Sequence, residues 1–423
     1  MKKRGVVGIS KKALLYTLAV LLLVTVTAVL SACAGSGIDI SKDVDEKATF
    51  PEFTRDPDDT YEWEESTEPP TETETEPETE EPVELVGLRE AFANYFYIGV
   101  ALPNNVLQNW VRYKDVILKN FNSITCENEM KPDFMLSQSE SRKNLDVTYT
   151  DPVVHFSSPQ LAVKYATQNN IKMRLHTLVW HAQTPKWFFT EDYTNEGNLV
   201  SRDVMLQRME SYIKQVLTYY KENYPGLIYA VDVVNEAFDV GNGDENGIRR
   251  VDNLWYQTIG PDYVYYAFYY ARKYAADDMK LFYNDYGCMY KIDLILRNLK
   301  KIKSEGLIDG IGMQAHMDYD TDSNAFKKAM RAFVEAGYEL QLTELDIGVK
   351  KNNEAQFKAQ ANQYKRIFQA AKELVERGYK VTSITVWGLT DTLTWRSGQY
   401  PLLFNSDLTP KPAISAILSV FDK

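Results

Sequence analysis

Short apolar runs recur along most of the chain, separated by longer segments in which apolar residues return at helical spacing. The runs are YFYIGVAL, FNSIT, IKMRLHTLV, IYAVDVV, KLFYND, IDGIGMQ, LQLTEL and VTSITVWGL. Runs of this kind are typical of parallel strands that are buried on both faces. The amphipathic segments include 203–224, 263–276, 291–305 and 355–377. Each of these segments predicts a helix with one buried face.

Strand and helix patterns alternate throughout this part of the chain. Such alternation predicts a parallel sheet with right-handed crossovers, and eight repeats close the sheet on itself. The length of the segment is ordinary for an eight-fold barrel with insertions. We therefore predict an α/β fold, a (β/α)8 TIM barrel, as the single folded domain over residues 83–423.

The chain begins with the basic segment MKKRGVVGISKK, followed by an apolar run from Ala13 to Leu30. This pattern predicts an export signal or a membrane anchor. The segment Leu30-Ser31-Ala32-Cys33 resembles a bacterial lipobox, in which the cysteine is acylated and becomes the new N-terminus. We predict a lipoprotein signal peptide over residues 1–33 that leaves the protein on the extracellular face of the bacterial cell envelope, anchored by lipid to the membrane or to an outer membrane. The alternative is an uncleaved transmembrane segment.

Residues 34–82 contain eighteen Asp and Glu against three Lys and Arg, and they end in the tract ESTEPPTETETEPETEEP. This composition cannot bury a core, so it predicts a disordered, self-repelling linker. The whole chain has a net charge of −12, whereas residues 83–423 carry only about −2 once the signal and the linker are set aside. Nothing in that balance suggests a nucleic-acid partner.

Besides Cys33, the chain contains Cys126 and Cys288, which fall at the second and fifth predicted strands. A disulfide between them would have to cross the barrel mouth, so free thiols are expected. The four histidines have no metal-ligand spacing, and no metal or cofactor is predicted.

Two glutamates occupy equivalent positions in the strand pattern. Glu236 follows the fourth strand in VDVVNEAF, and Glu344 lies on the seventh in LQLTELDI. Because α/β barrels build their active sites at the carboxyl ends of the strands, both carboxylates are expected at one mouth. A single glutamate there could equally charge the first turn of a helix or pair with a cation. Two such residues favour a shared site.

Further polar and aromatic residues follow the strands at the same end. They are Glu127, Asn128, Lys131, His176, Trp180, His181, Gln183, Asn235, Asn284, Asp285, Tyr286, Gln314, His316, Asp346, Trp387, Asp391, Trp395 and Arg396. Taken singly they have structural alternatives, in which the tryptophans are core aromatics, Asn235 is a cap, Lys131 is a solvated cation and His316 is a hydrogen-bonded core histidine.

Such a mouth suits a polar, uncharged, ring-shaped substrate, which is a sugar. Cleavage of a glycosidic bond needs one carboxylic acid to protonate the leaving oxygen and a second carboxylate to attack or to direct water, about 5 Å apart for retention. Glu236 and Glu344 are the candidates. The acid must keep its proton near neutral pH, which burial close to a second carboxylate promotes.

From about Glu84 to Lys423 the chain resembles the family 10 glycoside hydrolases, the retaining endo-β-1,4-xylanases. The resemblance rests on the ordered motifs FNSITCENEMKPD, RLHTLVWHAQTPKWFF, VDVVNEAFD, LFYNDYG, IDGIGMQAH, LQLTELDI and VWGLTDTLTWR. It implies hydrolysis of internal β-1,4 bonds of xylan by double displacement, with xylan and xylo-oligosaccharides as partners and no cofactor. A monomer is expected.

The resemblance also implies roles for individual residues. Glu236 would be the general acid/base and Glu344 the nucleophile, with Asn235 on the sugar 2-hydroxyl. His316, backed by Asp346, would orient Glu344. Gln314 would support the same region. The sugars nearest cleavage would lie under an aromatic lid of Trp387 and Trp395, and a sugar on the leaving-group side would stack on Tyr286. The residues that bind the glycone side would be Glu127, Asn128, Lys131, His176, Trp180 and Gln183.

The chain departs from the family pattern at Cys126, Leu175 and Gly287, where Pro, Gly and Asn are common. None of these replaces a residue that does chemistry. A β-1,4-glucanase or mannanase of the same clan is the rival enzyme, and a lectin that no longer cleaves xylan is the rival of another class. A tryptophan at position 395 should crowd the hydroxymethyl group of glucose, so xylan is expected to be preferred.

Overall fold

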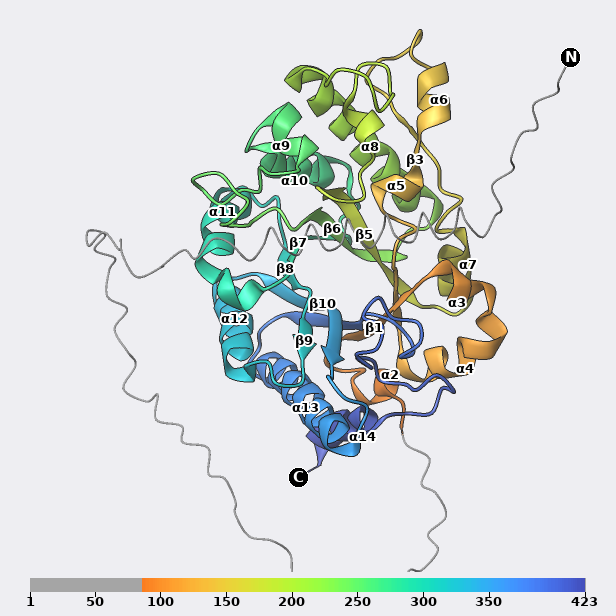
Figure 1. Cartoon of the computed structure of the whole chain (residues 1–423), viewed down its shortest axis with the longest axis vertical. Coiled ribbons are helices and arrows are strands. Elements are labelled where there is room, and N and C mark those ends of the chain that lie inside the picture. The colour runs from red at the N-terminus through yellow and green to blue at the C-terminus, as the bar shows by residue number, and fades with distance from the viewer. Residues whose placement is uncertain (1–85, 423) are drawn as a thin grey trace, which may run out of the picture. The chain divides into compact units, whose positions relative to one another are not determined.

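The computed structural model of the chain describes residues 86–422 (Figure 1). The predicted signal peptide with its Cys33 and the predicted linker lie outside the described residues and stay predictions. Within the described part, none of the helices has the length and apolar character needed to cross a bilayer.

Eight parallel strands close into the barrel that the sequence predicts. They are β1 (Tyr97–Leu102), β2 (Ser123–Cys126), β5 (Lys172–Trp180), β6 (Ile228–Asn235), β7 (Lys280–Asp285), β8 (Gly310–Met313), β10 (Glu339–Gly348) and β11 (Val381–Val386). Each strand pairs with the next, and β11 pairs with β1 to close the ring. The described residues also include three short strands: β3 (Leu136–Ser137), β4 (Val153–Val154) and β9 (His316–Asp318). The strand β9 pairs with the end of β10.

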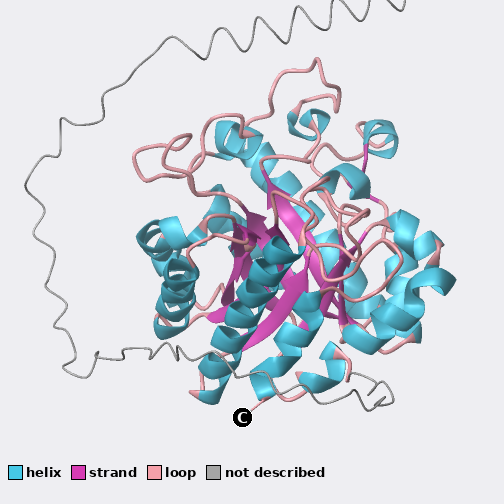
Figure 2. Ribbon diagram, turned by 60° about the horizontal axis from the view of Figure 1, so that its bottom comes forward, coloured by secondary structure: helices cyan, strands magenta, loops and turns pink. Residues whose placement is uncertain are grey.

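Helices surround the strands (Figure 2). The α-helices are α2 (Leu88–Ala91), α3 (Asn104–Gln108), α4 (Trp110–Asn120), α5 (Pro132–Met135), α6 (Gln138–Lys143), α7 (Gln160–Gln168), α8 (Arg202–Asn223), α9 (Leu254–Ile259), α10 (Tyr263–Tyr274), α11 (Ile292–Ser304), α12 (Ser323–Glu335), α13 (Glu354–Glu376) and α14 (Pro412–Leu418). The 3₁₀ helices are η1 (Lys186–Phe189), η2 (Cys288–Tyr290) and η3 (Ser419–Phe421). The four helices predicted from amphipathic segments are confirmed to within two residues as α8, α10, α11 and α13.

Local sequence signals set the ends of these helices. At the start of α12, the Asp322 carboxylate accepts hydrogen bonds from the backbone N–H groups of Asn324 and Ala325, at 2.9 and 3.1 Å. At its end, Gly337 has a φ of +80°. An acidic N-cap satisfies backbone donors that have no partner within the helix, and a glycine adopts the left-handed turn that closes it. The helix therefore begins and ends where its sequence directs.

The inside of the barrel is polar beneath the mouth. The Arg174 Nε atom on β5 donates to Gln341 Oε1 on β10 at 2.6 Å. These strands are not neighbours, so both side chains point inward across the barrel. Arg174 also forms a bidentate ion pair with Asp232 on β6, at 2.6 and 3.1 Å. A buried charge needs such a partner. This network forms the floor on which the mouth is built.

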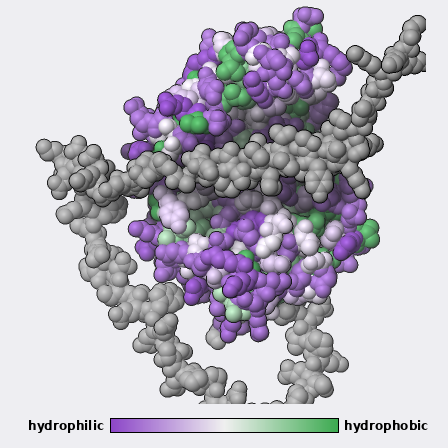
Figure 3. Space-filling model, in the orientation of Figure 1, coloured by the Kyte–Doolittle hydropathy of each residue, from purple (hydrophilic) through white to green (hydrophobic). Residues whose placement is uncertain are grey.

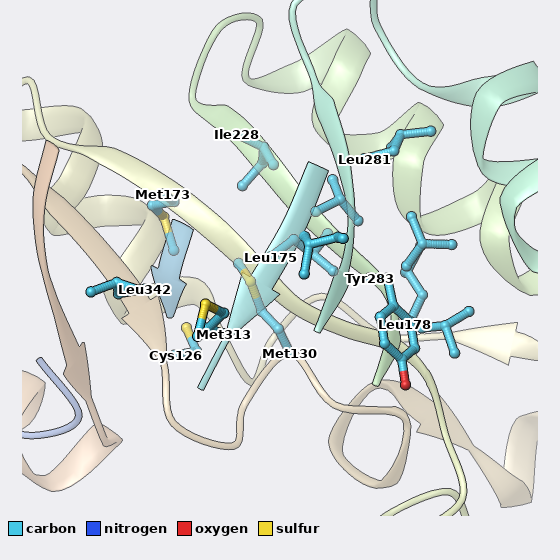
Figure 4. Close-up of a cluster of buried hydrophobic side chains, with 14 of the residues drawn as sticks. Cys126, Met130, Met173, Leu175, Leu178, Ile228, Leu281, Tyr283, Met313 and Leu342 are labelled. Atoms are coloured by element: carbon cyan, nitrogen blue, oxygen red, sulfur yellow. The ribbon is translucent and has the colours of Figure 1, made fainter. Parts of the chain in front are cut away.

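Side chains adjacent to the inward ones point outward, toward the helices. Met173 and Leu175 flank Arg174, Leu342 follows Gln341, and all three are fully buried. They belong to one apolar cluster, part of which Figure 4 shows together with Cys126 and Met313. This cluster joins the strands to the surrounding helices.

Cys126 and Cys288 are free, buried thiols, as predicted. On the face that Figure 3 shows, the uncovered surface of the barrel is mostly hydrophilic, with hydrophobic side chains scattered over it.

Candidate active site

The structure places the predicted nucleophile in an irregular part of its strand. The pairing of β10 with β11 shifts register between Leu342 and Leu345, around Glu344. Irregularities of this kind re-aim side chains and are frequent beside active sites. Glu344 is 5% exposed, and its backbone N–H donates to the Gln314 carbonyl at 2.9 Å. Its carboxylate lies at the carboxyl end of the seventh barrel strand, as predicted.

Each oxygen of the Glu344 carboxylate has its own partner. Asn284 Nδ2 donates to Oε1 at 2.7 Å, and His316 Nε2 lies 3.2 Å from Oε2. Burial raises the pKa of Glu344, but the hydrogen bond from His316, the charges of His176 and His316 and the bond from Asn284 outweigh it and hold the pKa at about 2. Glu344 is therefore an anion at neutral pH.

Glu236 directly follows β6 with a φ of +55°. A non-glycine residue in the left-handed region is uncommon, and such residues concentrate at functional sites. Its carboxylate accepts bonds from Trp180 Nε1 at 3.1 Å, Gln314 Nε2 at 2.8 Å and Asn235 Nδ2 at 3.3 Å. These donors are neutral, whereas Glu344 faces a histidine that can carry a charge. The two carboxylates thus have different surroundings.

A row of amides joins the two glutamates. The Asn235 Oδ1 atom accepts from Asn284 Nδ2 at 2.9 Å and from Gln314 Nε2 at 3.2 Å. Asn284 reaches on to Glu344, and Asn235 and Gln314 reach on to Glu236. Asn235 is therefore not the helix cap of the structural alternative. The role of Asn284 was missed, since its sequence position predicted only a place at the end of the fifth strand.

Behind Glu344, His316 is held by a second carboxylate. His316 Nδ1 lies 2.9 Å from Asp346 Oδ2. Burial lowers the pKa of His316, but the charge of Asp346 and the bonds to Asp346 and Glu344 outweigh it and raise the pKa to about 10. Asp346 in turn accepts from Trp395 Nε1 at 2.9 Å and Arg396 Nη1 at 2.8 Å. His316 is thus a charged link between two carboxylates.

The predicted glycone-side residues come together. Lys131 Nζ donates to Asn128 Oδ1 at 3.1 Å and to Gln183 Oε1 at 2.8 Å, and it lies 5.1 Å from the Trp180 ring centroid. Lys131 is 6% exposed, so the alternative of a solvated cation is wrong. Burial lowers the pKa of Lys131 and raises the pKa of the neighbouring Glu127.

His176 is fixed from below by the floor of the barrel. Its Nδ1 atom lies 2.9 Å from Asp232 Oδ2, the carboxylate that also binds Arg174. Its ring meets that of Trp387 edge-on, with centroids 5.4 Å apart. Trp387 is 7% exposed, whereas Trp395 is 58% exposed. Of the two predicted lid residues, Trp395 is therefore the open one, and it is not a core aromatic.

On the predicted leaving-group side, Tyr286 is surrounded by charges. Arg249 Nη2 donates to the Tyr286 hydroxyl at 2.9 Å and to Asp239 Oδ2 at 2.7 Å. The Lys291 ammonium lies 3.6 Å from the Tyr286 ring centroid, so it occupies one ring face. A stacked sugar would have the other face. Arg249 also was missed, because its loop has no strand pattern.

Three of the remaining strand-end residues have other partners or, in one case, a buried atom without a partner. Asp391 pairs with the buried Lys411 at 2.9 Å, and Asp285 pairs with Lys291 at 2.8 Å. His181 has a buried Nδ1 atom without a hydrogen-bond partner. Burial, together with the Arg249 charge, lowers its pKa to about 4. Among residues 86–422, no cluster of His, Cys, Asp and Glu could hold a metal ion.

A barrel mouth with two carboxylates, one kept ionised by a histidine and the other held by neutral donors, defines the class of carboxylate-based glycoside hydrolases. A family model described as glycosyl hydrolase family 10 matches residues 87–420. The chain belongs to that family.

Individual relatives agree with this assignment. The chain is 41% identical over 352 residues to endo-1,4-beta-xylanase Y of Acetivibrio thermocellus and 38% identical over 343 residues to endo-1,4-beta-xylanase B of Butyrivibrio fibrisolvens. Each match covers 79% of this chain but only 32% and 53% of those relatives. The chain thus spans about a third to a half of the length of these relatives.

Solved structures show the same architecture. A Clostridium thermocellum xylanase 10B comprising CBM22-1 and GH10 modules, complexed with xylohexaose, matches with a TM-score of 0.74 at 39% identity, over 79% of this chain and 67% of that one. An intracellular xylanase of Thermoanaerobacterium saccharolyticum, complexed with xylotriose, matches with a TM-score of 0.69 at 35% identity, over 79% and 98% of the two chains.

Proposed function

We propose that this protein is an endo-1,4-β-xylanase that hydrolyses internal bonds of xylan with retention of configuration. The observation that carries the proposal is the contrast between the two carboxylates. Glu344 is held as an anion by His316 and Asn284, as a nucleophile requires, whereas Glu236 accepts bonds from neutral donors only. The names of the relatives supply the substrate class.

The proposed reaction has two steps. In the first, a Glu344 oxygen attacks the anomeric carbon while Glu236 gives its proton to the leaving oxygen, so that a glycosyl-enzyme forms and one sugar chain departs. In the second, Glu236 takes a proton from water, and that water displaces Glu344 from the anomeric carbon. Two inversions give net retention, and both carboxyl groups return to their starting states.

The rival substrate is a β-1,4-glucan. One relative, 38% identical over 343 residues, is named exoglucanase XynX of Acetivibrio thermocellus. The indole N–H of the exposed Trp395 is tied to Asp346, and its ring centroid lies 4.9 Å from that of His316. This places the ring beside the residue that binds Glu344, where it should crowd a hydroxymethyl group. That contact favours xylan.

The test is the release of reducing sugar from arabinoxylan and from a soluble β-1,4-glucan by the purified protein, side by side. Strong release from xylan alone supports the proposal. Comparable or greater release from glucan would replace it with a glucanase. Binding of xylan without release from either polymer would point to a lectin instead.

We also propose that acylated Cys33 anchors the protein on the outer side of the cell envelope and that residues 34–82 space the domain from the membrane. The lipobox-like segment and the acidic composition support this arrangement. A Cys33→Ala variant should appear in the medium or accumulate as precursor. Retention of a processed Cys33→Ala form in the membrane fraction would rule the lipid anchor out.

A further inference from the structure

Among residues 86–422, Asn284 is the only residue whose side chain forms hydrogen bonds both to Glu344 and to Asn235. Its Nδ2 group donates to Glu344 Oε1 at 2.7 Å and to Asn235 Oδ1 at 2.9 Å. Both Asn284 and Asn235 are buried, at 0% and 2% exposure. Both N–H groups of the Asn284 amide are therefore engaged, one by the Glu344 carboxylate and the other by the Asn235 side chain.

The other end of the Asn284 amide is held by a threonine. Thr343 Oγ1 donates to Asn284 Oδ1 at 2.5 Å, and Thr343 is fully buried. A carboxylate only accepts hydrogen bonds, so the Asn284 NH2 group must face Glu344. Its oxygen then needs a donor, which the Thr343 hydroxyl supplies. Without that donor, the Asn284 amide would be held only through its nitrogen and not through its oxygen.

A glycine leaves room for this pair. A Cβ atom on Gly312 of β8 would lie 2.6 Å from Asn284 Oδ1 and 2.8 Å from Thr343 Cγ2. Contacts this close are not tolerated without movement. The absence of a side chain at position 312 therefore allows Thr343 and Asn284 to meet.

We propose that Thr343 is a positioning residue for the reaction: its hydroxyl orients the Asn284 amide so that an N–H group meets the Glu344 carboxylate. The inference rests on the proposed function, since it assigns Glu344 as the nucleophile. Thr343 is fully buried, and its hydroxyl bonds to Asn284 and not to the Glu344 carboxylate, so it acts through Asn284.

If Thr343 positions Asn284, its hydroxyl should affect the charge of Glu344. An N–H group on Oε1 stabilises the anionic form of Glu344. When the Thr343 hydroxyl is removed, Asn284 is free to turn its oxygen toward the carboxylate, which destabilises the anion. Thr343→Val keeps the shape of the side chain but lacks the hydroxyl. Thr343→Val should therefore raise the pKa of Glu344. The same substitution at a residue with only a structural role should leave that pKa unchanged.

The experiment measures kcat/KM on an aryl β-xylobioside against pH for the full chain. Thr343→Val should lose about ten- to a hundred-fold at neutral pH, the range for a hydrogen bond to a charged group, and the acid limb of its profile should move to higher pH. Thr343→Ser, which keeps the hydroxyl, should restore most of the rate and the position of the acid limb.

Thr385→Val is the matched control. Thr385 is also fully buried in a barrel strand, but its hydroxyl has no hydrogen-bond partner. The same substitution there should leave the rate and the pH profile unchanged. Gly312→Ala tests the geometry from the other side, because the added Cβ displaces Asn284 Oδ1, and it should move the acid limb in the same direction as Thr343→Val.

Several results would overturn the inference. They are an acid limb in Thr343→Val at the wild-type position, a limb in Thr343→Ser displaced as far as in Thr343→Val, or an equal displacement in Thr385→Val. Thermal unfolding of each variant separates a loss of fold from a loss of orientation. If the wild-type protein cleaves neither xylan nor the xylobioside, the proposed function itself fails. An active wild type with an unchanged Thr343→Val profile removes only the role of Thr343.

Discussion

At the scale of single residues, the two glutamates differ in the donors that surround them. Glu344 has a histidine on one oxygen and an amide on the other, while Glu236 has an indole and two amides. Charge-assisted bonds are stronger than neutral ones. The difference predicts which carboxyl group acts as the nucleophile and which as the acid/base, and it can be tested on each residue separately.

Removal of each glutamate should affect the two steps differently. A Glu344→Ala variant should lose activity on every substrate, since no glycosyl-enzyme can form. A Glu236→Ala variant should still be glycosylated by a substrate with a good leaving group, and added azide should restore turnover as a β-glycosyl azide. Steady-state rates on xylan and on an aryl xylobioside measure this, and equal losses on both substrates in both variants would count against the assignment of roles.

His316 should make the stability of the fold depend on pH. Its pKa is raised from 6.5 to about 10, so its charge stabilises the fold fully below about pH 6.5, and this stabilisation is lost as the pH rises toward 10. The pKa of Glu344 is lowered to about 2, so its contribution is present above its unfolded pKa and is lost as the pH falls toward 2. Between pH 5.5 and 9.5 the alkaline loss due to His316 should dominate.

Urea unfolding at pH 5.5 and 9.5 tests this dependence. The wild type should lose more stability across the interval than His316→Asn, which has no titrating ring. The exposed His155 provides the control, because His155→Asn should keep the wild-type loss. An identical pH dependence in wild type and His316→Asn would mean that the ion pair does not form.

Sequence alone predicted the carboxylates and most of their neighbours, because these residues follow strands and carry recognisable side chains. It did not predict the bond from Thr343 to Asn284. A threonine in a β-branched strand is unremarkable, and the bond joins two strands that are distant in the chain. Nor could the pattern show that Lys131 is buried, since its burial depends on the loops that carry Asn128 and Gln183.

At the scale of strands, the floor of the barrel depends on the buried pair between Arg174 and Asp232. Breaking a buried ion pair by removing one partner leaves an uncompensated charge. Arg174→Met should therefore destabilise the protein by about 3–5 kcal/mol, measured by urea unfolding. The exposed pair between Lys350 and Asp320 is the control, since solvent screens such a pair and Lys350→Met should change the stability far less than Arg174→Met. Similar losses of stability in the two variants would show that the buried pair does not support the barrel.

Trp395 belongs to the loop after the last strand, and its removal should change specificity more than mechanism. A Trp395→Ala variant should raise the ratio of activity on β-glucosides to activity on β-xylosides, because the ring no longer meets the hydroxymethyl group. Rates on aryl cellobioside and aryl xylobioside measure the ratio. A fall in this ratio would show that Trp395 does not exclude glucose.

Strand and helix positions were predictable because the sequence shows short apolar runs for the strands and apolar residues at helical spacing for the helices. All eight barrel strands and the four amphipathic helices match. The short strand β9 was not predicted, because three residues carry no periodic signal, and it places His316 within a strand pairing instead of a loop. The register shift around Glu344 likewise arises from strand pairing, which the sequence of one strand does not contain.

At the scale of the whole molecule, the predicted linker over residues 34–82 should matter for location and not for catalysis. A variant without residues 34–82 should keep its kcat/KM on soluble xylo-oligosaccharides within about twofold, because a segment of this acidic composition cannot bury a core and is not expected to be part of the folded domain. The measurement compares the full chain with the deletion variant at low and high salt. A large loss of activity at both salt concentrations would show that the linker takes part in the site.

The central claim is that Glu344 forms a covalent bond to the sugar. The direct measurement is intact-mass and peptide analysis after incubation with an activated 2-deoxy-2-fluoroxylobioside, whose first step is faster than its second. One added glycosyl group per protein is expected, located on the peptide that contains Glu344 and absent from a Glu344→Ala variant. A label on a different carboxylate, or turnover of xylan with no label at all, would contradict it.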